Sequence, residues 1–231
     1  MQTRVGEVLT RMIDDSSTRT NLIAVLQRAP DLLKPIASAF DLRLADWGAT
    51  ARGVYWRNEN GQKLRFEVLA RVLADDPGPF TVNDLGCGYG AFFDFLGPRL
   101  GPRLARFAGT DIAPAMIAEA QRRIVDPRAV FVRGLAAGED ADYSFASGTF
   151  NMCLKTKPAE WIDYVETSIA HLYGRSRKAL AFNMLSGEDN AREGLYYANS
   201  ERFAAFCRGL GAKVELVTDY PLDEWTIFAR R

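Results

Sequence analysis

Short apolar runs alternate with helix-like segments from about residue 80 to the end of the chain. The runs typical of strands occupy residues 80–85, 105–110, 129–132, 143–147, 179–184, 213–217 and 225–229. Between them, apolar residues recur with helical spacing over 91–96, 115–124, 159–173 and 201–210. Strands that alternate with helices predict an α/β fold, in which a mostly parallel sheet is covered by helices on both faces.

The first 80 residues follow a different pattern. Helical spacing over residues 1–40 predicts a helical extension, which we expect to be interrupted at Pro30 and Pro35 because proline lacks the backbone N–H. Residues 41–61 fit neither period and are rich in glycine, tryptophan and polar side chains, which predicts a loop or lid. An amphipathic helix is expected over 64–73. We therefore expect an N-terminal helical extension and lid at 1–62, followed by one domain at 63–231.

The charge balance limits the partners. The 231 residues include 29 Lys and Arg and 29 Asp and Glu, so the formal net charge is zero. Without a long-range field to gather nucleic acid or anionic lipid, we expect neither partner, and instead a small, weakly charged substrate. No apolar run approaches the length of a bilayer span, and the first residues lack a signal-peptide pattern. These features predict a cytoplasmic protein, which we expect to be a monomer or homodimer.

The chain has only three cysteines and one histidine. Cys87, Cys153 and Cys207 are an odd number and lack metal-ligand spacing, so we expect neither a disulfide framework nor a metal site. His171 falls on the polar face of the helix predicted over 159–173, which indicates a surface histidine. The enzyme would then have no histidine base.

A glycine-rich turn, D-L-G-C-G-Y-G at 84–90, joins the first predicted strand to a helix. Only glycine lets the backbone turn this sharply and approach a ligand closely, although a tight connection without a ligand is the alternative. The spacing G-x-G-x-G differs from the G-x-G-x-x-G of dinucleotide sites, whose glycines leave room for a pyrophosphate. The next strand ends in G-T-D-I at 109–112, which places Asp111 where a ribose diol can donate two hydrogen bonds.

These two segments closely resemble motif I and its successor in the class I methyltransferases that depend on S-adenosylmethionine (SAM). The resemblance covers about residues 80–231. It implies a Rossmann-like sheet of seven strands, mostly parallel with an antiparallel last strand, with helices on both faces and an N-terminal helical lid. It also implies a SAM site in which Asp111 holds the ribose hydroxyls, Ile112 and Leu135 pack on adenine, and the methionine and ribose portion lies against Asp84, Gly86, Cys87, Gly88 and Gly90.

The segment 142–151, D-Y-S-F-A-S-G-T-F-N, resembles the family's fourth-strand segment, which passes under the SAM sulfur and opens toward the substrate. This resemblance implies that Ser147 and Gly148 lie near the cofactor. It implies that Asn151 lies near the methyl acceptor, with a turn or helix-capping role as the alternative.

Three later blocks are similar to those of a bacterial subgroup of small methyltransferases: F-N-M-L-S at 182–186, Y-Y at 196–197 and D-Y-P at 219–221. The likeness implies that Asn183, Ser186 and Tyr197 point toward the pocket beyond the strand ends. For Tyr196, Tyr220 and Trp225 we favour core packing, because aromatic side chains usually serve the core.

The predicted lid and the helix after it supply further candidates. The SAM carboxylate needs a cation or a pair of donors, and Arg65 can grip it with two parallel bonds; Gln62 lies on the same helix. Tyr55 and Trp56 would form walls over the sulfonium, where an aromatic face attracts positive charge. The alternative is a solvated arginine and two packed rings.

Three functions are compatible with these residues. The first is transfer of a methyl group from SAM to oxygen, nitrogen or carbon of a small metabolite, for example of secondary metabolism, aligned by Asn151, Asn183, Ser186 and Tyr197. The second is cyclisation of SAM's own amino-acid arm with release of methylthioadenosine, because the layout is similar also to SAM-dependent azetidine-2-carboxylate synthases. The third is a non-catalytic SAM-binding protein.

Overall fold

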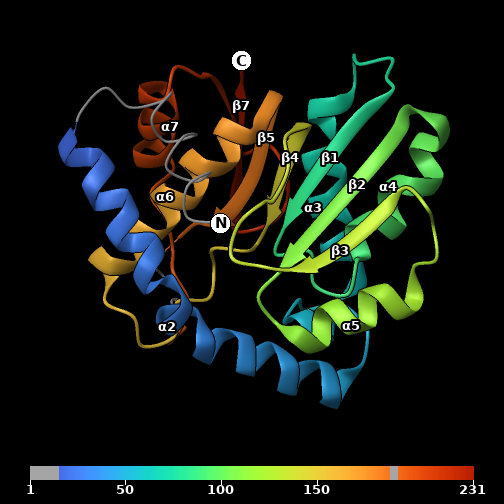
Figure 1. Cartoon of the computed structure of the whole chain (residues 1–231), viewed down its shortest axis with the longest axis horizontal. Coiled ribbons are helices and arrows are strands. Elements are labelled where there is room, and N and C mark those ends of the chain that lie inside the picture. Colours follow the sequence, from blue (N-terminus) through green and yellow to red (C-terminus); the bar gives the residue numbers. More distant parts are fainter. Residues whose placement is uncertain (1–15, 188–191) are drawn as a thin grey trace.

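One seven-stranded sheet forms the centre of the molecule. The computed structural model describes residues 16–187 and 192–231 (Figure 1). The strand order is β3-β2-β1-β4-β5-β7-β6; β7 runs antiparallel to β5 and β6, and the other neighbouring strands pair in parallel. The strands are β1 (Phe80–Leu85), β2 (Leu104–Asp111), β3 (Ala129–Arg133), β4 (Ala141–Ser147), β5 (Ser176–Leu185), β6 (Lys213–Val217) and β7 (Glu224–Arg230). The predicted Rossmann-like sheet with an antiparallel last strand is confirmed.

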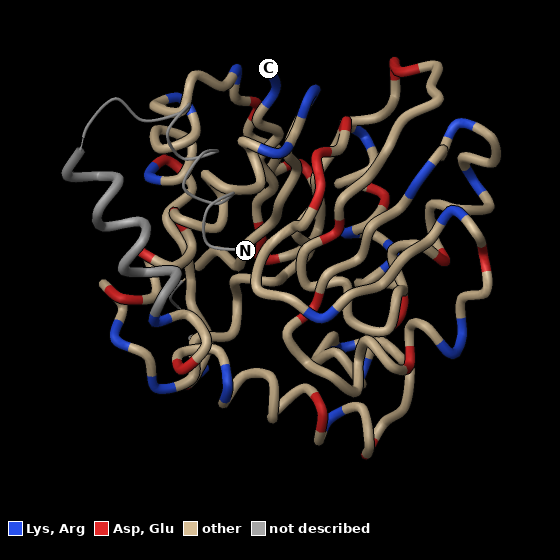
Figure 2. The backbone as a smooth tube through the Cα atoms, in the orientation of Figure 1, with Lys and Arg blue, Asp and Glu red and all other residues tan. Residues whose placement is uncertain are grey.

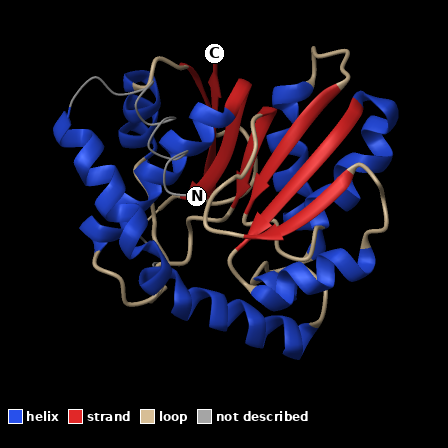
Figure 3. Cartoon of the chain, viewed as in Figure 1, coloured by secondary structure: helices blue, strands red, loops and turns tan. Residues whose placement is uncertain are grey.

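Helices cover both faces of the sheet (Figure 3). Side chains of α3, α4 and α5 belong to one apolar cluster, and those of α2, α6 and α7 belong to another. The helices are α2 (Ser16–Trp47), α3 (Glu59–Ala70), α4 (Ala91–Leu100), α5 (Pro114–Arg123), α6 (Pro158–Arg175) and α7 (Ser200–Gly209), with short 3-10 helices at Arg52–Val54, Arg71–Leu73 and Gly101–Arg103.

The two clusters are rich in aromatic side chains. On the α4 face, the ring of Phe92 lies 4.9 Å from that of Phe145 and 5.0 Å from that of Phe66, measured between centroids. On the α6 face, Trp225 is buried between Phe182 and Phe203. Each fully buried large apolar side chain contributes roughly 1.5–3 kcal/mol. The prediction of core packing is confirmed for Tyr220 and Trp225, which are buried, while Tyr196 packs half-buried against the α6-face cluster.

The N-terminal helix departs from the prediction. Pro30 and Pro35 both lie inside α2, which continues unbroken to Trp47 and bends about midway along its length (Figure 1). Proline removes a hydrogen bond and bends a helix without necessarily ending it. Ala29, Leu33 and Ile36 are buried at helical spacing in the α6-face cluster, and this burial offsets the lost backbone bonds. The expected extension at 1–15 lies outside the described residues.

More than half of the predicted loop or lid at 41–61 is helical instead. Residues 41–47 form the last turns of α2, and α3 begins at Glu59, capped by the Asn58 side chain, which accepts a hydrogen bond from Gly61 N. Asp41 of α2 accepts from Ala115 N at the start of α5, with 3.0 Å between the atoms, and so ties α2 to the rest of the fold. The polar residues at 41–61 suggest a loop when only the sequence is considered. In the structure, the Asn58 cap and the hydrogen bond between Asp41 and Ala115 place much of this stretch at the ends of α2 and α3.

Acidic and basic positions are interspersed along the backbone (Figure 2). Within the ranges described above, no helix is both long enough and apolar enough to cross a bilayer.

Candidate active site

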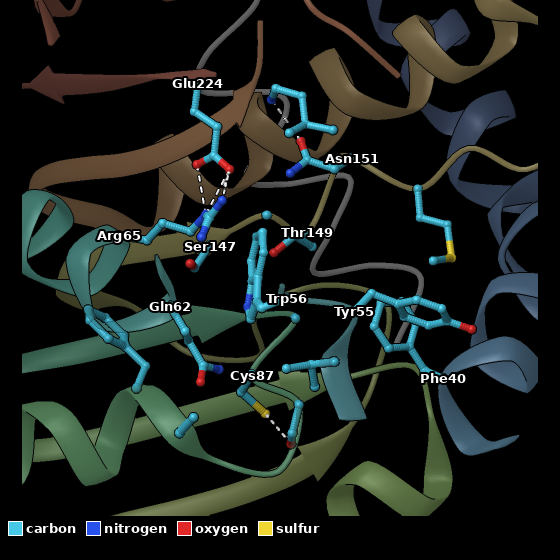
Figure 4. Close-up of a pocket in the computed structure, with 18 of the residues that line it drawn as sticks. Phe40, Tyr55, Trp56, Gln62, Arg65, Cys87, Ser147, Thr149, Asn151 and Glu224 are labelled. Carbon is cyan, nitrogen blue, oxygen red and sulfur yellow. Dashed lines mark hydrogen bonds and ion pairs between the residues drawn. The ribbon is translucent and has the colours of Figure 1, made fainter. Parts of the chain in front are cut away.

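A cavity of about 530 Å³ opens at the carboxyl ends of β1, β2 and β4. In Figure 1, α2 crosses the side of the molecule toward which β1 and β2 point. Leu33, Ile36 and Phe40 of α2 line the cavity together with side chains of α3 and the loop before it. Figure 4 shows the labelled side chains of Trp56, Gln62 and Arg65 close to those of Ser147 and Thr149.

The glycine turn between β1 and α4 forms one wall. Gly86, Gly88 and Gly90 have φ angles of 75°, 53° and 87°, in the left-handed region that favours glycine. At Gly86, a Cβ atom would lie 2.5 Å from the Oγ1 atom of Thr149, and at Gly90 one would lie 2.4 Å from the Cδ1 atom of Ile124. All three positions therefore favour glycine for conformation, and Gly86 and Gly90 favour it for space as well.

Asp111 braces this turn from the end of β2. Its Oδ2 atom accepts from Gly88 N at 2.8 Å, and its Oδ1 atom accepts from Ala113 N at 2.9 Å. Burial raises the pKa of the carboxyl, and the backbone N–H donors oppose that rise. Each carboxylate oxygen has further lone pairs, so the carboxylate at the cavity wall can accept more hydrogen bonds.

Asp84, near the end of β1, is 2% exposed, and its side chain makes no hydrogen bond or ion pair with any described residue. Burial, and then the nearby charge of Asp111, raises its pKa well above the usual value. A buried carboxylate without a partner is costly. Because Asp84 lines the cavity, a bound molecule carrying hydroxyl or ammonium donors would remove that cost.

Two more polar atoms lack partners at the end of β4. Asn151 accepts from Leu185 N at 3.1 Å through Oδ1, which directs its Nδ2 atom toward Gly148. Both Asn151 Nδ2 and Ser147 Oγ are buried and have no hydrogen-bond partner among the described residues. These two orphaned atoms flank Gly148 in the cavity wall and indicate a ligand with complementary polar groups.

Arg65 faces Glu224 across the rim of the cavity (Figure 4). Its Nε atom donates to both Glu224 oxygens, at 2.7 and 2.9 Å, and its guanidinium carbon lies 3.9 Å from the centroid of Trp56. Glu224 also accepts from Asn183 Nδ2 at 2.7 Å, and Asn183 Oδ1 accepts from Gly148 N at 3.0 Å. Burial raises the pKa of Glu224, and Arg65 opposes this rise.

Most of the residues predicted from the sequence do surround one cavity. The lining includes Tyr55, Trp56, Arg65, Asp84, Gly86, Cys87, Gly88, Asp111, Ile112, Leu135, Ser147, Gly148 and Asn151.

Four of the predicted residues lie outside that lining: Gly90, Asn183, Ser186 and Tyr197. Gly90 turns the chain into α4. Ser186 donates its backbone N–H to Asp223 O, and the Tyr197 hydroxyl accepts from Arg192 N at 3.1 Å. The roles assigned to these four residues and to those in the lining stay predictions.

Several cavity residues escaped the sequence analysis. Glu224 lies in the D-E-W stretch just after the quoted D-Y-P block, but nothing local showed that it would meet Arg65, 159 residues earlier. Trp161 and Tyr164 occupy successive turns of α6 on its apolar face, a pattern that predicts only core packing. Burial raises the Tyr164 pKa to about 12, so the hydroxyl stays protonated at neutral pH.

The prediction of a surface histidine is wrong. His171 is 3% exposed, and its Nε2 atom lies 3.1 Å from Ala137 O. Burial lowers its pKa. The segment between β3 and β4, which includes the buried Ala137, packs against α6 at this position. His171 is absent from the cavity lining, so it does not supply a base there. Cys87, Cys153 and Cys207 are free thiols.

Known proteins resemble this chain in sequence and in fold. The model of a methyltransferase domain matches residues 82–177. The protein described as "Putative methyltransferase Rv1506c" of Mycobacterium tuberculosis (strain ATCC 25618 / H37Rv) is 38% identical over 158 residues, which cover 66% of this chain and 94% of that protein.

Two solved structures share the fold. Magnesium protoporphyrin IX methyltransferase (ChlM) from Synechocystis PCC 6803, with bound SAH, has a TM-score of 0.58 at 17% identity and covers 74% of this chain and 84% of its own. The SAM-bound amino pentose methyltransferase CalS10 from Micromonospora echinaspora has a TM-score of 0.55 at 19% identity. The match covers 76% of this chain and 93% of CalS10. The chain belongs to the class I SAM-dependent methyltransferases, and its cofactor is SAM.

Proposed function

We propose that this enzyme transfers the methyl group of SAM to an oxygen, nitrogen or carbon atom of a small metabolite. The observation that carries the proposal is the pair of orphaned polar atoms, Asn151 Nδ2 and Ser147 Oγ, beside Gly148. The same cavity is also lined by Met152, Leu185 and Leu195, in addition to the glycine turn and Asp111. This additional lining supports a second substrate.

The donor set fits the cofactor. Asp111 would accept from the ribose hydroxyls, and the unpartnered carboxylate of Asp84 would meet the donors of the methionine portion. Ile112 and Leu135, both half-buried at the cavity wall, would pack on adenine. When bound, SAM supplies an electrophilic methyl group on a sulfonium.

The acceptor end would work mainly by alignment. Asn151 Nδ2 can donate to the acceptor, while the Leu185 N–H holds the amide in place. The Trp56 ring packs on Gly148, where a Cβ atom would lie 2.3 Å from its Cη2 atom, so this ring helps to keep water out. Positioning alone can supply several kcal/mol of catalysis, so such a site needs no histidine base.

Product analysis tests the proposal. The enzyme is incubated with SAM alone and with SAM plus fractionated metabolite pools. S-adenosylhomocysteine formed only with a pool supports methyl transfer. Methylthioadenosine formed without an acceptor would instead establish the cyclisation alternative, and neither product from any pool would favour a non-catalytic binding protein.

We also propose the division into an extension and lid at 1–62 and a SAM-binding domain at 63–231. The lack of a nucleic-acid partner is a further proposal, supported by the balance of 29 basic and 29 acidic residues. A cytoplasmic location and a monomeric or homodimeric state are proposed as well. Size-exclusion chromatography with light scattering tests the oligomeric state.

A further inference from the structure

We propose that the methyl acceptor carries an anionic group, a carboxylate or a phosphate, on a planar apolar body, and that four arginines at the cavity mouth bind it. This inference rests on the proposed function and names its substrate class. The mouth is a second cavity of about 330 Å³, lined by Arg43, Trp47, Arg52, Tyr55, Trp56, Arg57 and Arg192. We call this set the arginine mouth.

The arginine mouth adjoins the active-site cavity. Four of its seven residues also line that cavity: Tyr55, Trp56, Arg57 and Arg192. Trp56 borders both spaces and also packs against Gly148, just after β4. An anionic group held at the mouth would therefore lie next to the cavity that Asn151 and Ser147 line.

No described carboxylate pairs with the arginines of the mouth. None of the carboxylates in the described part of the chain lies within ion-pair distance of Arg43, Arg52, Arg57 or Arg192. Arg65, by contrast, is paired with Glu224. Four like charges around one cavity repel one another, and a bound anion would relieve that repulsion.

Aromatic rings hold two of the guanidinium groups. The guanidinium carbon of Arg43 lies 4.9 Å from the ring centroids of both Trp47 and Tyr55, and that of Arg52 lies 5.1 Å from the centroid of Trp47. Arg43 Nε donates to Arg52 O at 2.8 Å. Ring contacts of this kind fix a guanidinium while leaving other N–H groups available to an anion.

Tyr55 is held in place at a conformational cost. Its φ angle is 64°, in the left-handed region that side chains other than glycine rarely adopt. Its hydroxyl donates to Ala39 O at 3.1 Å, and its ring meets Phe40 edge-on at 5.3 Å between centroids. Strain of this kind persists where surrounding contacts over-determine a residue, and it concentrates at ligand-binding sites.

These features select the ligand class. Arginine recognises carboxylate and phosphate with paired hydrogen bonds, and the rings of the mouth suit a planar body. The apolar side of the cavity, formed by Ile36, Phe40 and Trp161, has room for that body. SAM carries a single carboxylate, and four arginines are more than that one group needs. The zero net charge of the whole chain gave no indication of this local cluster of arginines.

The test uses two fluorescent probes with one carbon skeleton. The anion 1-anilinonaphthalene-8-sulfonate and its neutral analogue N-phenyl-1-naphthylamine are titrated into the full chain saturated with S-adenosylhomocysteine. The double variant Arg57→Gln/Arg192→Gln removes two exposed mouth charges, and Arg122→Gln/Arg208→Gln removes two exposed charges outside both cavities as a matched control. We expect the mouth variant to bind the sulfonate at least about tenfold more weakly, while the neutral probe and the control variant are unaffected.

Competition with benzoate and phenyl phosphate then distinguishes a carboxylate from a phosphate ligand, according to which displaces the sulfonate at lower concentration. Unchanged sulfonate affinity in the mouth variant, or displacement by neither competitor, would overturn the inference. Calorimetry with S-adenosylhomocysteine separates the remaining cases. A tenfold loss of its affinity in the mouth variant would assign the arginines to the cofactor carboxylate and overturn the inference, whereas no binding to the wild type would refute the proposed function itself.

Discussion

Arg65 and Glu224, 159 residues apart in the sequence, form a two-sided contact in which the Arg65 Nε atom donates to both carboxylate oxygens and the Nη2 atom donates to Oε1. The side chains are 11% and 1% exposed. The Trp56 ring covers the guanidinium, at 3.9 Å from its centroid. This buried pair therefore fixes α3 against β7 and sets the position of Trp56 over Gly148.

Replacing one member of this pair should destabilise the fold. Glu224→Gln leaves the Arg65 charge largely buried without its counter-ion, and we expect the free energy of unfolding to fall by about 3 kcal/mol, measured by urea denaturation. Asp223→Asn removes the same charge from the exposed neighbouring residue and should change stability by less than about 0.5 kcal/mol. Equal effects of the two variants would show that the ion pair does not matter.

Asp84→Asn should stabilise the protein without cofactor and weaken SAM binding. Burial raises the Asp84 pKa in the folded state, so the stability that this group contributes below pH 3.8 is lost as the pH rises toward the folded pKa. The advantage of the variant should therefore be absent below pH 3.8 and grow above it. Thermal unfolding between pH 3 and 8 measures this difference.

The exposed Asp75 supplies the control for that experiment, since Asp75→Asn should change stability by less than about 0.5 kcal/mol. A cofactor-free Asp84→Asn variant that is less stable than the wild type at pH 7 would contradict the view that Asp84 awaits a ligand.

Asp111→Asn should raise the dissociation constant of SAM at least about tenfold, because each hydrogen bond to a charged group contributes roughly 1.5–3 kcal/mol. The amide can accept through only one of the two oxygens that now bind Gly88 N and Ala113 N. Asp41→Asn is the control, because it alters a carboxylate outside the cavity and keeps the hydrogen bond to Ala115 N. The affinity of this variant for SAM should match that of the wild type. Calorimetry measures both, and unchanged affinity in Asp111→Asn would refute the ribose role.

Asn151→Asp should separate turnover from cofactor binding. The carboxylate still accepts from Leu185 N, but the Nδ2 donor is gone. We expect turnover to fall by about 10- to 100-fold with little change in SAM affinity, because alignment of the acceptor matters chiefly in the transition state. Tyr197→Phe is the comparison variant, since Tyr197 lies outside the cavity lining. A larger loss in Tyr197→Phe would place the acceptor nearer Tyr197.

The sequence by itself determined the strands and the glycine turn. β1 and β6 coincide with the predicted ranges, because a short run of apolar and β-branched residues specifies a strand locally. The positions of Gly86 and Asp111 could also be predicted from the sequence, since a positive φ angle and a carboxylate at a strand end are properties of single residues in a local pattern.

Tertiary structure decided the rest. Pro30 and Pro35 remain within α2 because burial of its neighbouring side chains outweighs a local rule. His171 is buried where the segment between β3 and β4 packs against α6 at Ala137. Glu224 meets Arg65, 159 residues away, only when α3 packs on the sheet, and it meets Asn183, 41 residues away, because β5 pairs with β7. No local periodicity encodes either meeting.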